Sequence, residues 1–137
     1  MNKSIAIILP YKEIYSKNHA AAASIWVKDY FNLSKLKDET LIYGNLGKNL
    51  KPITKNFKNI KISKNSFSKN KSYINFFYKE YKKINFKIIE IHNRPEYLNY
   101  LIKKKVKSKL IFFFHNNPKD IRGSKSIKER LFILDNT

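Results

Sequence analysis

Several absences limit the classes of protein to which this chain can belong. Its 137 residues include no cysteine, so we expect neither disulfide bonds nor a thiolate metal site. No apolar run in the sequence approaches the roughly 20 residues that a membrane-spanning helix needs. The amino-terminal apolar segment, IAIILP, is too short for a secretory signal. The sequence therefore predicts a cytoplasmic protein.

Glycine is also scarce, with three residues in the whole chain. The loop after the first predicted strand, PYKEIYSKNHAAAAS, contains none, so the dinucleotide fingerprint and the P-loop are both absent. The alanines at 20–23 would still let a ligand approach the amino end of the next helix, near Lys12, Lys17 and Asn18. Asn18 is also expected to cap that helix. The alternative is that the alanines only let the helix pack closely on the sheet.

Acidic residues are few, 10 against 29 basic ones, which gives a formal net charge of +19. Only three of the basic residues are arginine, and lysine, asparagine and isoleucine, all encoded by A/T-rich codons, fill 61 of the 137 positions. Genome composition therefore explains much of the charge. Proteins that bind nucleic acid usually also use arginine, because its planar guanidinium group forms paired hydrogen bonds with phosphates and bases. No nucleic-acid partner is therefore expected.

The positive charge is concentrated in the middle of the chain. Residues 48–87 carry +11 with a single acid, against +2 in residues 1–47 and +6 in residues 88–137. Aromatic residues lie among these lysines, including Phe67, Tyr73, Phe76, Phe77, Tyr78 and Tyr81. This pattern suits an anionic membrane surface, which would place the protein at the inner face of the cytoplasmic membrane. Stacking of nucleic-acid bases on the aromatic rings is the less favoured alternative.

Apolar runs alternate with helical patterns along the chain. Strands are predicted at 4–9, 40–43, 88–91 and 110–114, with a weak candidate at 60–62. Helices are predicted over 20–36, over 71–84, over 95–105 beginning at Pro95, and from near Ser124. This order predicts an α/β fold: one Rossmann-like domain with a parallel sheet flanked by helices. Because the last helix runs to the end of the sequence without a returning strand, the domain is expected to be incomplete.

Two predicted strands stop at the same dipeptide, His-Asn. The first is IIEIHNRPEY, with His92 and Asn93, and the second is LIFFFHNNPKDIRGSK, with His115 and Asn116 23 positions later. The carboxyl ends of neighbouring parallel strands meet at one edge of a sheet, where α/β proteins bind ligands. The sequence therefore predicts that the two dipeptides form a single site.

Residues around these dipeptides could bind an anionic sugar substrate. Arg94 would pair with a phosphate or carboxylate, and Glu90 would accept a hydrogen bond from a sugar hydroxyl. The alternative for the first dipeptide is an asparagine turn, a helix begun by proline and a surface arginine. No zinc site is predicted, because the three histidines lie far apart in the sequence.

The segment after the second dipeptide also suits an anion. Gly123 and Ser124 precede the last predicted helix, whose free N–H groups would face the ligand, and Arg122 and Lys125 add positive charge. The alternative is that Ser124 simply caps that helix.

Three stretches resemble the amino-terminal domain of family 4 glycosyltransferases of the GT-B type, which build lipopolysaccharide or other surface glycans. They are ILPYKEIYSKNHAAAASIWVKDY, EIHNRPEYLNYL and LIFFFHNNPKDIRGSKSIKERLFIL; residues 45–86 match no part of that domain. The resemblance implies a Rossmann-like domain that faces a carboxy-terminal domain across a cleft. It further implies retaining transfer from a nucleotide sugar to a glycan or lipid-linked acceptor, with no metal and no other cofactor.

The resemblance also implies residue roles. His115 would be the catalytic residue at the reacting centre, Asn93 and Arg94 would line the acceptor side, and the loop at 11–18 would approach the nucleotide diphosphate. The full set of substrate-binding candidates is Lys12, Asn18, His92, Asn93, Arg94, Asn116, Arg122, Gly123, Ser124 and Lys125.

The chain departs from the family pattern at two points. Family members commonly carry glycine where this chain has His19 and Ala20, and the donor-binding domain with its glutamate-rich motif is missing. Because transfer requires both substrates to be positioned, we expect the chain alone to be inactive. The alternatives are the basic membrane-surface module and a flavodoxin-like receiver, which would need more acids near the first strand than Glu13 alone.

Overall fold

Five parallel strands form the centre of the protein, in a computed structural model that describes residues 3–62 and 65–137. The strands are β1 (Ile5–Ile8), β2 (Thr40–Gly44), β3 (Phe57–Asn59), β4 (Ile88–His92) and β5 (Lys109–Phe113). Their order across the sheet is β3-β2-β1-β4-β5, and every neighbouring pair is parallel. The predicted α/β, Rossmann-like architecture is confirmed.

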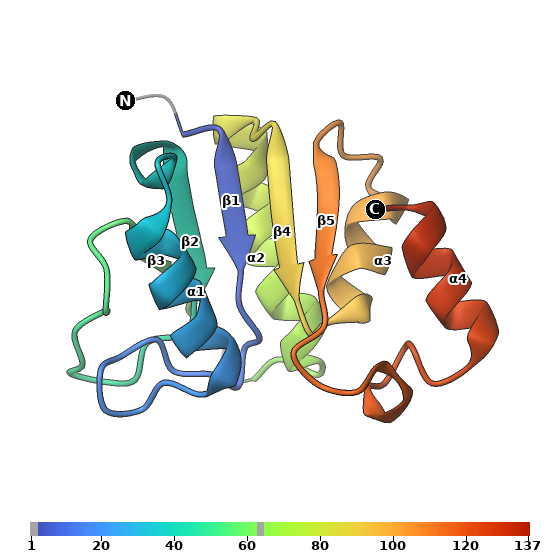
Figure 1. Cartoon of the computed structure of the whole chain (residues 1–137), viewed down its shortest axis with the longest axis horizontal. Helices are drawn as coiled ribbons and strands as arrows, with labels where there is room; N and C mark the ends of the chain where they lie inside the picture. Colours follow the sequence, from blue (N-terminus) through green and yellow to red (C-terminus); the bar gives the residue numbers. More distant parts are fainter. Residues whose placement is uncertain (1–2, 63–64) are drawn as a thin grey trace.

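Helices cover both faces of this sheet, as Figure 1 shows. They are α1 (Ala22–Leu33), α2 (Lys69–Ile84), α3 (Pro95–Lys103) and α4 (Ile127–Asp135), with short 3-10 turns η1 (Lys37–Glu39) and η2 (Pro118–Asp120). Side chains of α1 form one core with the sheet, including Val27, Phe31 and Ile42. Side chains of α2, α3 and α4 join the core on the opposite face.

The chain changes direction across the sheet at β1, which pairs with β2 on one side and β4 on the other. Ile7 and Ile8 have no exposed surface, because this central strand is covered on both faces. In open parallel sheets, ligands bind outside the carboxyl ends of the strands at such a switch point. In Figure 1 these ends lie along the lower edge of the sheet.

The weak strand predicted at 60–62 is wrong by three residues. The edge strand β3 spans Phe57–Asn59 because it pairs in register with Ile42, Tyr43 and Gly44, and β2 ends at Gly44. The N–H of Ile60 still donates to the carbonyl of Gly44 at 2.8 Å, as the last bond of this pairing. The ring of Phe57 also stacks on Tyr15, with 5.0 Å between centroids, and this contact holds the strand in place.

Two helix starts differ from the predicted ones. Helix α1 begins at Ala22, and Asn18 does not cap it; the N-cap position is Ala21, whose side chain makes no capping bond. Helix α4 begins at Ile127, where Ser126 and Glu129 form a capping box, so Ser124 is not the cap. The Ser124 hydroxyl instead donates to the carbonyl of Pro118 at 2.6 Å.

The other helices follow the sequence pattern closely. Helix α3 begins at Pro95, as predicted, and α2 begins after Ser68, whose hydroxyl accepts the N–H of Lys71. Asn85 ends α2 with a left-handed backbone (φ 57°), a conformation that asparagine tolerates better than most residues. In the described part of the chain, no helix has the length and apolar character that a membrane crossing would require.

Candidate functional site

The two His-Asn dipeptides lie side by side at the carboxyl ends of β4 and β5. Because His92 pairs in register with Phe113, His115 lies two residues further along on the same face of the sheet. Nδ1 of His92 is 2.7 Å from Nε2 of His115, and the Asn93 amide donates to Oδ1 of Asn116, also at 2.7 Å. The predicted meeting of the two dipeptides at one edge is therefore confirmed.

Asn93 fixes the geometry of this edge through its backbone and its side chain. Its backbone is left-handed (φ 53°), which turns the chain sharply after β4. Its N–H donates to the carbonyl of Phe113 at 2.9 Å, and its Oδ1 accepts the N–H of His115 at 2.7 Å. These bonds join the two loops and hold the imidazole of His115 beside that of His92.

Trp26 of α1 covers the histidine pair on one face of the sheet. Its ring centroid lies 5.6 Å from that of His92, 5.0 Å from that of Phe113 and 5.5 Å from that of His115. His92 has no exposed surface, whereas His115 is half-buried. Of the two histidines predicted to contact a substrate, only His115 has a surface that solvent reaches, and His92 touches the edge of the sheet only through it.

Glu90 lies beneath the same helix, two residues before His92 on the same face of β4. Its Oε2 is 4.0 Å from Nε2 of His92, and its Oε1 accepts a hydrogen bond from the Tyr30 hydroxyl at 3.5 Å. Glu90 is 4% exposed, so the predicted contact between this carboxylate and a sugar hydroxyl is wrong. Tyr30 and the sheet cover the position that a sugar would have to reach.

Burial changes the protonation of all three groups. It raises the pKa of Glu90 to about 7, against the smaller opposing effect of the Tyr30 hydroxyl. Burial, with the neighbouring His115, lowers the pKa of His92 to about 3. Burial also lowers the pKa of His115, although the charge of Glu13 opposes this. Both imidazoles are therefore neutral at pH 7, and Glu90 is the group that titrates near neutrality.

Lys12 lies on a cation-rich cleft of about 910 Å³, beyond the ends of β1, β2 and β3. We call this the lysine cleft; its cations are Lys12, Lys48, Lys61 and Lys69. Of these four lysines the sequence predicts only Lys12 as a site residue. The strand order that brings the other three beside it cannot be derived from the sequence. The high charge of residues 48–87 was the one signal that pointed to them.

Asn18 is exposed, and the amino end of α1 beside it is already occupied by Glu13. Oε2 of Glu13 accepts both the N–H and the hydroxyl of Ser24 at 2.8 Å. A carboxylate thus fills the position where the nucleotide diphosphate was expected to approach the helix. In this loop the positive charge lies at the lysine cleft rather than at the helix end.

Arg94 packs against the loop that follows β1. Its guanidinium carbon lies 5.9 Å from the centroid of the Tyr11 ring, and its Nε is buried with no hydrogen-bond partner in the described residues. This arginine is therefore held between the lysine cleft, which Tyr11 also lines, and the start of α3.

The segment around Gly123 has mainly structural contacts. Gly123 has φ 90°, and a Cβ there would lie 3.0 Å from Cβ of Pro95, so glycine permits the close approach to α3. Ser124 is fully buried and Lys125 is exposed. Arg122 is exposed, and its Nε lies 3.3 Å from Oε1 of Glu96. The structure does not place these residues among the contacts of His115.

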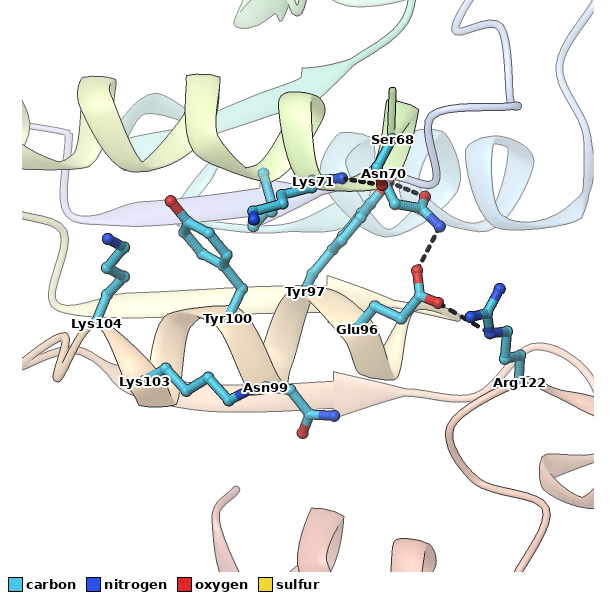
Figure 2. A pocket seen from close by; sticks show the side chains of 11 residues that line it. Ser68, Asn70, Lys71, Glu96, Tyr97, Asn99, Tyr100, Lys103, Lys104 and Arg122 are labelled. Carbon is cyan, nitrogen blue, oxygen red and sulfur yellow. Dashed lines mark hydrogen bonds and ion pairs between the residues drawn. The ribbon is translucent and has the colours of Figure 1, made fainter. Parts of the chain in front are cut away.

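Arg122 instead lines a second groove, of about 610 Å³, between α2 and α3 (Figure 2). We call it the α2–α3 groove. Lys71, Lys103 and Lys104 add to its positive charge, and Tyr97 and Tyr100 form part of its wall. Glu96, its one acid, is hydrogen-bonded to Asn70 and paired with Arg122, as the dashed lines in Figure 2 show.

Comparisons with known proteins identify no relative of this chain. No family model matches it, and neither the curated proteins nor the solved structures contain a match. Within residues 3–62 and 65–137, no three histidine or acidic side chains gather as a metal site.

Proposed function

We propose that this chain is the acceptor-side, Rossmann-like domain of a retaining GT-B glycosyltransferase. The reaction would transfer a sugar from a nucleotide sugar to a lipopolysaccharide or other surface-glycan acceptor, in the cytoplasm at the inner face of the membrane. The observation that carries the proposal is the half-buried, neutral His115, held by His92 at the carboxyl ends of two parallel strands. The resemblance of three sequence stretches to that family supports it.

The chemistry of His115 suits a sugar hydroxyl. Its Nε2 is engaged by His92, and within the described residues its Nδ1 has no hydrogen-bond partner. A neutral imidazole nitrogen accepts or donates one hydrogen bond, which matches the needs of a hydroxyl that is about to react. Asn116, exposed beside it, offers a further polar side chain.

The lysine cleft suits a phosphate on either substrate. Four lysine side chains line it, and Glu13 is directed away from it, toward Ser24. A lipid-linked acceptor and a nucleotide sugar both carry phosphate groups that lysine binds as a point charge. The partner domain that the resemblance implies would hold the nucleotide, so we still expect no measurable sugar transfer by this chain alone.

Saturation-transfer-difference NMR tests the acceptor assignment without requiring catalysis. The probe is the core oligosaccharide released from lipopolysaccharide, added to the native chain, to His115→Ala and to Lys35→Ala as a control. Lys35 is exposed after the carboxyl end of α1, away from the site. We expect saturation of the oligosaccharide by the native and control proteins and at least a severalfold loss with His115→Ala. No saturation, or equal saturation in all three, would contradict the proposal.

A second candidate function is binding to an anionic membrane surface, and one observation favours it. Phe67, immediately before α2, is fully exposed and shares a surface hollow with Lys71 and Lys104. An exposed aromatic ring surrounded by lysines can enter the headgroup region while the ammonium groups contact anionic lipid. This surface adjoins the α2–α3 groove and is compatible with a lipid-linked acceptor.

Co-sedimentation with vesicles tests the membrane assignment. The native chain should sediment with phosphatidylcholine vesicles that contain phosphatidylglycerol and remain in solution with phosphatidylcholine alone, and added salt should release it. Phe67→Ser should weaken sedimentation severalfold. Leu33→Ser, at another highly exposed apolar residue at the end of α1, should not. Equal effects of the two substitutions would argue against this surface.

A further inference from the structure

We propose that Glu90, His92 and His115 form a proton relay in which protonation of Glu90 decides whether Nδ1 of His115 accepts or donates a hydrogen bond. The relay is a property of this chain; the identity of its ligand, a sugar hydroxyl, and the proton movement during sugar transfer rest on the proposed function. Glu90 and His92 are positioning residues here, because His115 alone reaches the rim.

The three side chains lie in a row on the face of the sheet that α1 covers. His92 is the middle member: its Nδ1 is 2.7 Å from Nε2 of His115, and its Nε2 is 4.0 Å from Oε2 of Glu90. Both atoms of the longer contact are buried and have no hydrogen-bond partner in the described residues. Such atoms are costly to leave unpaired, and the broad terminal torsion of glutamate allows the carboxylate to turn toward Nε2 of His92.

Ionised Glu90 determines which ring nitrogen carries the proton in each imidazole. The carboxylate accepts from Nε2–H of His92, so Nδ1 of His92 carries a lone pair. That lone pair accepts Nε2–H of His115, which leaves Nδ1 of His115 unprotonated at the rim. In this state the site accepts a hydrogen bond from a ligand hydroxyl.

When Glu90 is protonated, every hydrogen bond in the row reverses its direction. The carboxyl O–H donates to Nε2 of His92, Nδ1–H of His92 donates to Nε2 of His115, and Nδ1 of His115 carries a proton. One proton has been added to the row, and both rings remain neutral. The rim nitrogen then donates, so the same residue presents the opposite polarity to a ligand.

The same path moves a proton inward during transfer. The acceptor hydroxyl gives its proton to Nδ1 of His115, the Nε2 proton of His115 passes to His92, and that of His92 passes to Glu90. The hydroxyl oxygen bonds to the anomeric carbon on the same face from which the diphosphate leaves, so that configuration is retained. The bond from that carbon to the diphosphate breaks, and its electron pair leaves with the diphosphate. Because burial disfavours a charged His92, ending the proton on Glu90, whose pKa is about 7, avoids an imidazolium.

The surroundings of the row make Glu90 the group whose protonation state sets the tautomers of both histidines. Tyr30 of α1 contacts its other oxygen, and Ile7 of β1 lies beside it in register. Trp26 and Phe113 flank the imidazoles, and Glu13, from the loop after β1, is the charged group that acts on His115. Among the described residues, Glu90 is thus the only ionisable partner within reach of Nε2 of His92.

Ring nitrogen-15 shifts of the histidines, followed from about pH 5.5 to about 8.5 without ligand, test the relay. We expect His92 to pass from the Nδ1–H tautomer at low pH to Nε2–H at high pH, with His115 following in parallel at a midpoint near 7. Glu90→Gln should abolish the transition, and Asp29→Asn, which removes an exposed carboxylate of α1, should preserve it. Tautomers that do not change in the native chain, or a transition that persists in Glu90→Gln, would overturn the relay.

The pH titration of the native chain tests the relay even if Glu90→Gln does not fold. No saccharide is present, so the outcome is also independent of the proposed function. A chain that binds no oligosaccharide can still show the tautomer transition, and one that binds it can fail to show the transition.

Discussion

Glu90 and His92, buried together under α1, give the stability of the fold opposing dependences on pH. The folded-state pKa of His92 is lowered to about 3, so its contribution to stability is present above the unfolded pKa and is lost as pH falls. The pKa of Glu90 is raised to about 7, so the folded state binds the proton more tightly than the unfolded state does. Its contribution is therefore complete at low pH and is lost as pH rises through 7.

Glu90→Gln should separate these two effects. We expect the variant to match the native free energy of unfolding near pH 5, where Glu90 is protonated. Near pH 8 it should exceed the native value by roughly 2 to 3 kcal/mol, because ionising the buried carboxylate destabilises the native fold by about 1.4 kcal/mol for each unit by which burial raises its pKa. Urea unfolding at the two pH values measures this, with Asp29→Asn as the control. A difference that does not depend on pH would contradict the burial of Glu90 described here.

Among the helices, α3 and α4 have the same length and very different packing. Each has nine residues, yet α3 buries Pro95, Tyr97, Leu98 and Leu101, whereas α4 buries Ile133 alone. Ile127, Leu131 and Leu134 of α4 are more than half exposed. A helix held by so few buried contacts opens at a smaller free-energy cost than the rest of the domain.

Hydrogen exchange should therefore distinguish the two helices. We expect backbone amides of α4 to exchange faster than those of α3 under native conditions. Ile133→Ala should accelerate exchange in α4 further, and Leu134→Ala, at an exposed position, should leave it nearly unchanged. Protection of α4 equal to that of α3 would show that its packing is stronger than these contacts indicate.

Sequence periodicity predicted the elements better than it predicted their ends. The apolar runs that became β1, β2, β4 and β5 were found because buried parallel strands are continuously apolar. The start of α1 was missed because its cap comes from Glu13, in a loop nine residues before the helix. Local capping rules consider only the residues beside a helix end. The edge strand β3 was misplaced because its position depends on where β2 ends.

On the scale of the whole molecule, strand order decides which distant residues meet. Identical dipeptides after two adjacent strands were enough to predict the pairing of His92 with His115. The sequence could not show that Trp26 would cover His92, or that the charge of residues 48–87 would divide between the lysine cleft and the surface around α2. Those features depend on how α1 and β3 sit against the sheet.

The hydrogen bond between the two imidazoles is the contact on which the site depends, and NMR can observe it directly. In the chain labelled with nitrogen-15 histidine, a scalar coupling across that bond should link Nδ1 of His92 to Nε2 of His115 at neutral pH. We predict a cross-peak that joins these two nitrogens and leaves His19 unconnected. Resolved, neutral spectra of both rings with no such cross-peak would show that the two strand ends do not form one site.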